Sequence, residues 1–175
     1  MLTARRLGLV ALIIVALGMP STAKAQESAI IQATATVISS LAIIGTNNLV
    51  FGSITPGINK SVLRTSSGFA GEWSLTGTAL AELSLTFTLP TDLIHSSGIG
   101  TMPISFSSSD AAYSDGTGSQ AVPTGVINPL GPSTANLGVG ELMNVWIGGT
   151  VQPSIAQSGG DYTASITLSV AYTGN

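Results

Sequence analysis

The feature that most constrains the fold is a regular alternation in the last stretch of the chain, from Asp161 to Thr173. Its apolar row includes Ile166, Leu168, Val170 and Tyr172, and mostly small polar residues fill the positions between them. Alternation with a period of two is typical of a β-strand that has one buried and one solvated face. A chain that ends on its best strand must first form the sheet that this strand joins. The sequence therefore predicts an all-β domain that its C-terminal strand completes.

Shorter runs of this kind occur along the rest of the chain, separated by Gly and Pro. The runs that predict strands are residues 29–39, 41–44, 49–52, 60–65, 71–78, 82–89, 101–107, 122–127 and 141–151. The spacer 79–81 predicts a hairpin between its two flanking strands, and Gly148-Gly149 predicts a β-bulge. Residues 108–133 predict a long surface loop around one short strand. Many short strands without a helical period favour a single antiparallel β-sandwich domain, residues 26–175.

Residues 1–25 have the pattern of a cleavable signal peptide. Arg5 and Arg6 precede an uncharged apolar run, residues 7–19, that is shorter than the ~20 residues of a membrane-spanning helix. Ala23-Lys24-Ala25 is a small-x-small cleavage pattern, so we expect the mature chain to begin at Gln26. The alternatives are an uncleaved anchor, for which the run is short, and twin-arginine export, which the flanking residues match poorly. We expect export to the periplasm, the cell surface or the medium.

Charge and cysteine content narrow the function further. The mature chain would keep Lys60 and Arg64 against eight acidic residues, a net charge of −6. Such a chain is not expected to bind nucleic acid or an anionic membrane. Both basic residues fall in the 60–65 run, which predicts an edge strand. Only 7% of all residues are charged and none is cysteine, so packing and backbone hydrogen bonds must hold an exported form together.

The residue patterns of common active sites are missing from the sequence. It contains no HExxH, no GxSxG, no phosphate-binding glycine loop and no cluster spaced for a metal. Its one histidine, His95, could act as a base for Ser96 or Ser97, but the sequence offers no group to orient it, and a solvated loop histidine is the simpler interpretation. We expect no enzymatic activity, no cofactor and no metal.

Two pairs of acidic residues have a functional and a structural interpretation. Asp110 and Asp115 do not make up a complete calcium loop, because closely spaced oxygen ligands are missing, so a polar turn is favoured. Glu72 and Glu82 would approach each other across the predicted hairpin, as the paired carboxylates of a glycosidase do. No aromatic residues that would line a cleft accompany them, so solvation at an edge is the simpler account.

The exposed backbone of a sheet edge is the remaining route to function. A sandwich cannot close every edge, and secreted β-domains use an open edge to accept a strand from another subunit. Residues 26–38 have the alternation of a donor strand, and the same segment could equally be the first strand of its own sheet. The predicted subunit contact combines the two terminal apolar rows, Ile31, Ala33, Ala35, Val37, Ile166, Leu168, Val170 and Tyr172.

Three short motifs occur in a fixed order: Leu49-x-Phe51-Gly52 after the first strand, Gly77 before a strand that ends in Leu89-Pro90, and Gly160-x-Tyr162 before the last strand. In this order they resemble a family of small secreted bacterial proteins of unknown function, similar to spore-coat-U and fimbrial-subunit (pilin-like) proteins. The resemblance implies an immunoglobulin-like sandwich, export, and assembly into surface fibres by strand donation. Unlike many such proteins, this chain lacks a disulfide, and three residues follow Tyr172.

We therefore expect an exported structural subunit of a bacterial surface fibre or coat that associates by β-strand addition. Its expected partners are further copies or other surface subunits, with a periplasmic chaperone as an additional candidate. The alternative is a monomeric periplasmic or secreted binding module, for example for carbohydrate, that uses exposed aromatic residues such as Tyr113 or Trp73. Trp73 and Trp146 could stack on a sugar, although Trp more often fills a sandwich core.

Overall fold

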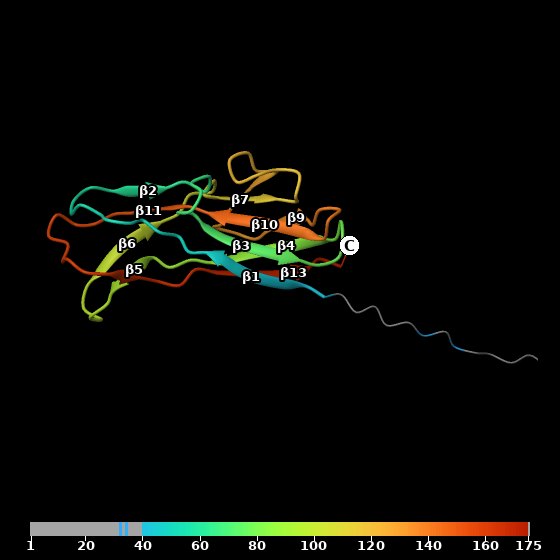
Figure 1. Cartoon of the computed structure of the whole chain (residues 1–175). Helices are drawn as coiled ribbons and strands as arrows, with labels where there is room; N and C mark the ends of the chain where they lie inside the picture. Colours follow the sequence, from blue (N-terminus) through green and yellow to red (C-terminus); the bar gives the residue numbers. More distant parts are fainter. Residues whose placement is uncertain (1–31, 33, 35–39, 175) are drawn as a thin grey trace, which may run out of the picture. The chain divides into compact units, whose positions relative to one another are not determined.

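The structure is a computed structural model that describes residues 32, 34 and 40–174. The chain divides into two compact units, residues 1–36 and 37–175, and the strands belong to the second unit. Within residues 40–174 there are thirteen strands and no helix, and every strand pairing is antiparallel (Figure 1). The all-β prediction is confirmed for this part of the chain. The predicted signal peptide lies outside the described residues, and so does the predicted first strand, 29–39, apart from residues 32 and 34.

The strands are β1 (Ala42–Asn47), β2 (Lys60–Val62), β3 (Gly71–Thr76), β4 (Glu82–Thr88), β5 (Asp92–His95), β6 (Thr101–Ser105), β7 (Ala111–Ser114), β8 (Gly125–Ile127), β9 (Ser133–Asn136), β10 (Leu142–Ile147), β11 (Gly149–Val151), β12 (Tyr162–Thr163) and β13 (Thr167–Tyr172). They form three sheets, which we call the first sheet (β1-β3-β10-β7-β8), the middle sheet (β12-β5-β6-β11-β2) and the short sheet (β13-β4-β9).

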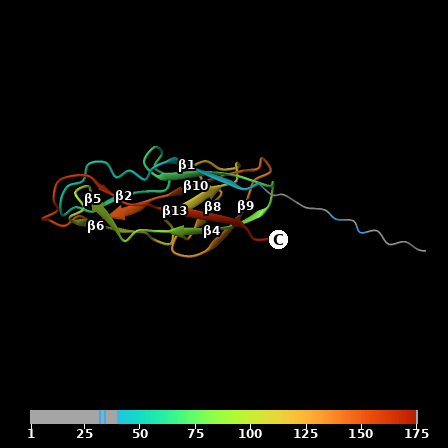
Figure 2. The same ribbon diagram turned by 90° about the horizontal axis from the view of Figure 1, so that it is seen from below.

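The first sheet and the short sheet pack face to face, as in a β-sandwich (Figure 2). Between them lies the first core, which combines apolar side chains of β3, β4 and β10 with Leu168 of β13. Leu75, Leu83 and Val145 are fully buried there. The alternating sequence pattern produces this core directly, because every second side chain of each strand points toward the facing sheet.

The middle sheet builds a second, smaller core. Its buried members include Val62 of β2, Ile104 of β6 and Val151 of β11, and Phe51 joins them from the irregular chain between β1 and β2. Lys60 lies on β2 at the edge of this sheet, as the position of the basic residues predicts. The second core is the part of the fold that positions the candidate site.

The predicted hairpin between residues 71–78 and 82–89 is wrong. β3 pairs with β1 and β10, whereas β4 pairs with β13 and β9 in the opposite sheet. The two strands face each other across the first core because both bury their apolar row in it. The chain between them crosses from sheet to sheet. Its backbone bonds to a neighbouring loop instead, where Gly77 N donates to Glu141 O at 3.1 Å.

The C-terminal stretch is also divided rather than continuous. β12 pairs with β5 in the middle sheet and β13 pairs with β4 in the short sheet, with a break at Ala164–Ile166. Its apolar row serves both cores: Tyr162 packs against the second and Leu168 is buried in the first. The alternation therefore predicts the buried face correctly and the strand length wrongly.

Four further predictions about the strands differ from the structure. Residues 49–52 form no strand, since Val50 N bonds to Phe69 O at 2.7 Å outside any ladder. The 108–133 segment contains β7 as well as β8, and no sequence pattern predicts β5 or β9. The predicted bulge at Gly148-Gly149 is a change of sheet: β10 ends at Ile147 in the first sheet and β11 begins at Gly149 in the middle sheet.

Gly148→Ala tests this change of sheet. A Cβ at residue 148 would overlap the carbonyl oxygen of Val62 and lie 2.7 Å from Arg64 N, both backbone atoms that cannot rotate away. We expect Gly148→Ala to lower the free energy of unfolding by about 1–3 kcal/mol, the usual cost of overpacking, in urea titrations. Gly140→Ala is the matched control, because a Cβ there meets nothing within 4 Å. Equal stabilities of the two variants would contradict the crossing geometry.

Candidate functional site

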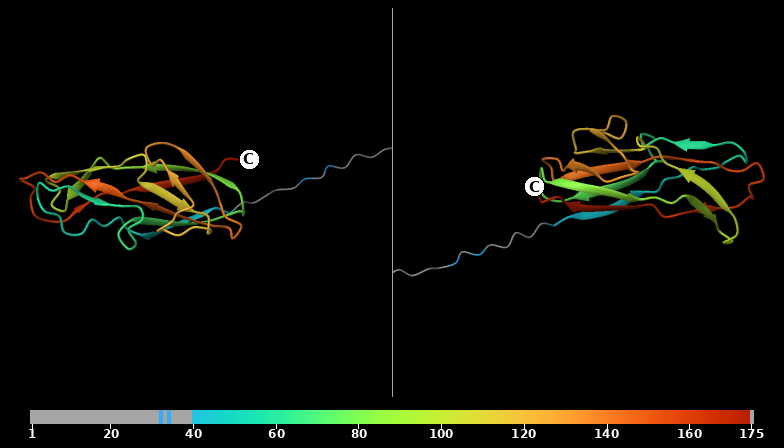
Figure 3. Two further views of the ribbon diagram at one scale, coloured as in Figure 1. Left: turned by 90° about the horizontal axis from the view of Figure 1, so that it is seen from above. Right: turned by 180° about the vertical axis from the view of Figure 1, so that it is seen from behind.

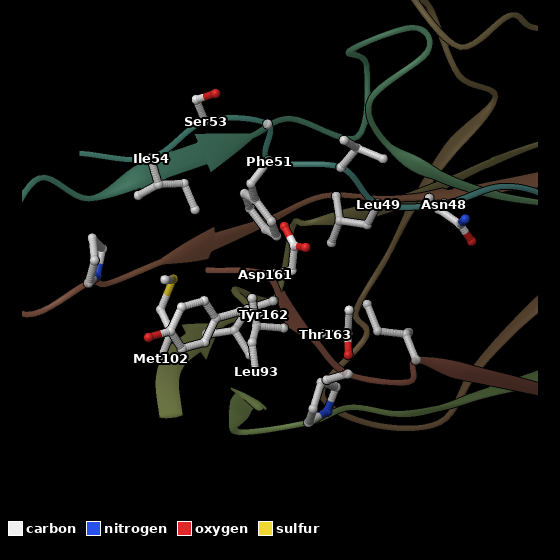
Figure 4. Close-up of a pocket in the computed structure, with 18 of the residues that line it drawn as sticks. Asn48, Leu49, Phe51, Ser53, Ile54, Leu93, Met102, Asp161, Tyr162 and Thr163 are labelled. Carbon is white, nitrogen blue, oxygen red and sulfur yellow. The ribbon is translucent and has the colours of Figure 1, made fainter. Parts of the chain in front are cut away.

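A groove with a volume of about 1070 Å³ lies over the second core. One wall is the chain from Gly45 to Ile54, and the other is the chain from Gln157 to Ile166. In Figure 4, Phe51 points from the first wall toward Tyr162, Leu93 and Met102. Two segments more than 100 residues apart in the sequence thus line one groove.

The floor of the groove is the second core itself. Leu93 of β5, Met102 and Ile104 of β6 and Phe51 belong to both the groove lining and this core. Protein interiors are normally close-packed, with few voids larger than a water molecule. The groove is thus open to solvent above an apolar floor.

Two of the terminal strands have long edges, and one of them, β1, also contributes Gly45 and Asn47 to the groove. β1 is a terminal strand of the first sheet and β13 a terminal strand of the short sheet, with six residues each. The other terminal strands, β2, β8, β9 and β12, have two to four residues. Natural proteins protect sheet edges by keeping them short or charged. The two long edges carry no charged residue, so they are the least protected edges among the described strands.

The charge of the groove has one sign. Glu72 and Asp161 are the charged residues among those that line it. Glu72 is half-buried and Asp161 is exposed at the rim. An anionic ligand would meet two carboxylates there, so the groove suits a neutral or cationic occupant.

His95 contacts the wall of the groove that residues 157–166 form. Ser97 N donates to His95 Nδ1 at 3.1 Å, so Nδ1 accepts and the proton lies on Nε2, which donates to Gly159 O at 3.1 Å. The ring also packs edge-on against Tyr162, with ring centroids 4.9 Å apart. His95 is thus the last residue of β5 rather than a solvated loop residue. Ser97 Oγ lies 2.7 Å from Nδ1, and the opposite nitrogen faces a backbone carbonyl.

The predicted contact residues of the C-terminal row point inward. Leu168 is 5% exposed in the first core, and Ile166, Val170 and Tyr172 pack against that core while partly buried. Of these, Ile166 also lines the groove. The surface that β13 offers to a partner is therefore its backbone edge. Ile31, Ala33, Ala35 and Val37 lie outside the described residues.

The other candidate side chains occupy structural positions. Glu72 and Glu82 lie on strands of different sheets, so the prediction that they meet across a hairpin is wrong. Trp146 is 4% exposed, as core burial predicts. Trp73 is half-buried, packs edge-on against Phe87 at 5.9 Å and lines the groove.

Asp115 closes a polar turn, as the sequence predicts. Its Oδ1 accepts hydrogen bonds from Thr117 N at 3.0 Å and Thr124 Oγ1 at 2.9 Å, and also from the Thr117 hydroxyl. These bonds, with the Thr117 side chain first, hold the pKa of Asp115 below its ordinary value. Asp110 Oδ2 similarly accepts from Ser107 N at 2.7 Å.

The groove lining is not predictable from local sequence patterns. Leu93, Met102 and Tyr162 come from three separate strands, and no local pattern brings them together. The one signal in the sequence is the interruption by Gly159-Gly160, which lies in one wall and precedes Tyr162.

Comparison with known proteins finds no matching family model and no matching curated protein. Among the described residues, no helix has the length and apolarity needed to cross a membrane. The same residues contain no group of three or more His, Cys, Asp or Glu that could hold a metal ion.

Tyr162→Phe tests the wall of the groove. The Tyr162 hydroxyl accepts from Gln157 Nε2 at 2.7 Å and donates to Ser158 O at 2.9 Å. We expect its removal to lower the free energy of unfolding by about 0.5–1.5 kcal/mol. Tyr113→Phe is the control, because the Tyr113 hydroxyl has no hydrogen bond among the described residues. Chemical denaturation measures both, and an equal loss in both variants would contradict the role of the hydroxyl.

Asp115 also gives a pH-dependent prediction. A lowered pKa in the folded state means that the carboxylate stabilises the fold at pH above the ordinary value of 3.8. That contribution is lost as the pH falls through the lower, folded-state pKa. We expect a carboxyl NMR titration of Asp115 to give a midpoint below 3.8, and Thr124→Val to move it upward. A midpoint unchanged by Thr124→Val would refute the hydrogen-bond cause.

Proposed function

We propose that this protein is an exported structural subunit of a bacterial surface fibre or coat, and that its copies associate by β-strand addition. The donor in this proposal is residues 26–38 of one copy. The acceptor is the groove of the next copy, together with the open edges of β1 and β13. The observation that carries the proposal is a groove with an apolar floor in a body that also has two long, uncharged strand edges.

The groove matches what an added strand requires. Such a strand needs backbone partners along its length and an apolar floor for every second side chain. Among the described strands, β13 pairs with β4 alone and β1 pairs with β3 alone. Within 48–54, the described residues give one backbone–backbone hydrogen bond, from Val50 to Phe69. The wall formed by residues 48–54 therefore keeps backbone groups available for a partner.

The donor segment matches the groove in chemistry. Its row Ile31, Ala33, Ala35 and Val37 is apolar, and the segment contains no basic residue and a single acid, Glu27. Burial of a large aliphatic side chain contributes about 1.5–3 kcal/mol, and alanine contributes less. The signal-peptide pattern of residues 1–25 supports export. An immunoglobulin-like strand arrangement is supported by two facing antiparallel sheets and by the resemblance to fimbrial-subunit proteins.

A binding module is the alternative, and the groove gives it one specific support. Trp73 and Tyr162 line the groove beside Glu72 and Asp161, which is a combination of aromatic and carboxylate side chains that sugars bind. Tyr113, the other candidate, is half-buried and packs against the first core. The same groove would then hold a soluble ligand instead of a strand.

Deletion of residues 26–38 tests the proposal. We expect the mature protein to form ladders of multimers that survive warm detergent, and the deletion to leave a folded monomer. A synthetic peptide of residues 26–38 should then bind the deleted protein and change its tryptophan fluorescence, because Trp73 lines the groove.

Ile54→Lys supplies a matched test on the acceptor side. Ile54 lines the groove while partly buried, so a lysine there should prevent peptide binding. Val126→Lys, on the distant edge strand β8, should leave binding intact. A mature protein that stays monomeric at high concentration, with a deletion that only unfolds it, would refute strand addition. Glycan binding that Trp73→Ala abolishes in a folded protein would then support the alternative.

A further inference from the structure

We infer that copies joined by strand addition also touch end to end, through exposed aliphatic side chains at the two ends of the body. Ile58, Ile99 and Ile155 at one end would contact Leu80 and Val139 at the opposite end of the next copy. This inference rests on the proposed strand addition and adds a second contact surface, whose partner is another copy of this chain.

Leu80 and Val139 lie at the end of the body from which the donor segment would extend, and we call it the exit end. Its two loops, 77–81 and 137–141, lie side by side, because Leu137 N donates to Ala81 O at 3.0 Å. Ser40 is held there by the Tyr172 hydroxyl, which donates to Ser40 O at 3.3 Å. Figure 3 shows the start of β1 and the C-terminus at this same end.

The opposite end consists of the loops 55–58, 96–100 and 153–157, and we call it the mouth end. Gly57 N donates to Ser154 O at 3.0 Å and Gln157 Nε2 to Thr101 O at 3.1 Å, so these loops are joined. The groove reaches this end, because Pro56 and Pro153 line it. Two long runs of chain, β4–β5 and β10–β11, lead from the exit end to the mouth end (Figure 1).

The length of the donor segment brings the two ends together. Residues 26–39 number fourteen and span at most about 50 Å when fully extended. One wall of the groove, from Gly45 to Ile54, is ten residues long. A donor that runs parallel to this wall, with its C-terminal end at Ile54, leaves about four residues, or roughly 13 Å of extended chain, between the two bodies. In this direction the exit end of the donor copy lies close to the mouth end of the acceptor.

The side chains at both ends are unusually exposed for aliphatic residues. At the mouth end Ile155 is 90% exposed and Ile99 82%, and at the exit end Val139 is 80% exposed. Leu80 is 62% exposed although its φ of 61° is in the left-handed region, which bulky residues rarely adopt. The Leu80 side chain is thus exposed rather than packed, and the position is not a glycine, which would adopt this φ without strain. In the inferred contact, these side chains of the two ends would be buried against each other.

The mouth end and the exit end expose different residues, so their contact would join two unlike surfaces. A contact between different patches of identical subunits is heterologous, and it forms an open chain unless its rotation closes a ring. End-to-end contact between the mouth end and the exit end therefore supports the linear growth that a fibre needs.

Cross-linking through introduced cysteines tests the contact, since the natural chain has none. The variant is the mature chain, residues 26–175, with Val139→Cys and Ile155→Cys. After treatment with a short bismaleimide, we expect covalent ladders that persist after complete denaturation. The control pairs Val139→Cys with Leu130→Cys, which is also an exposed aliphatic position, at 61%. It should give at least about tenfold less cross-linked product. A second pair, Leu80→Cys with Ile99→Cys, repeats the test on different loops.

The outcomes separate the two hypotheses. Multimers with ladders from either end-to-end pair support the contact. Multimers without these ladders, or with equal ladders from the control, overturn the contact and leave strand addition standing. If the natural sequence forms no multimers, strand addition fails and the end-to-end contact fails with it.

Discussion

The change of sheet at Gly148 is the constraint on which the rest of the structure depends. A side chain there would overlap the backbone of residues 62–64, so a glycine lets β10 continue into β11 at close range. The crossing joins the two cores, because Ile147 is buried in the first and Val151 in the second. It also takes β11 out of the first sheet. The second core is consequently covered by irregular chain around Phe51 rather than by a facing sheet, and the groove is the result.

A groove with an apolar floor is ambiguous by itself, because a small ligand and a β-strand can both bind to such a floor. The edges beside it favour the strand. A soluble ligand gains nothing from unpaired backbone along β1 and β13, whereas an added strand forms hydrogen bonds with it. The two carboxylates of the groove, Glu72 and Asp161, agree with an occupant of low charge, and residues 26–38 have Glu27 as their single charged side chain. The proposed donor and acceptor are thus complementary in both backbone and side-chain chemistry.

The sequence predicts which face of a strand is buried better than it predicts which strands pair. Alternation correctly identifies the buried rows of β4, β10 and β13, because period two is a local property of a strand. It misplaces a hairpin at 79–81 and joins β12 to β13, because pairing depends on residues far apart in the chain. β5 and β9 are too short to produce a recognisable pattern. The groove cannot be predicted, since it arises only when 45–54 meets 157–166 over β5 and β6.

The distribution of charge over the edges links this fold to its proposed assembly. β2 carries Lys60, whose ammonium donates to Ser53 O at 2.9 Å, and the other short edges offer few backbone groups. β1 and β13 are neither charged nor short, and Ile44 on β1 is 66% exposed. An edge of this kind would promote disordered aggregation in a protein meant to stay monomeric. In a subunit that receives a strand at that position, the same edge is protected by the partner, so its lack of charge becomes a condition of assembly.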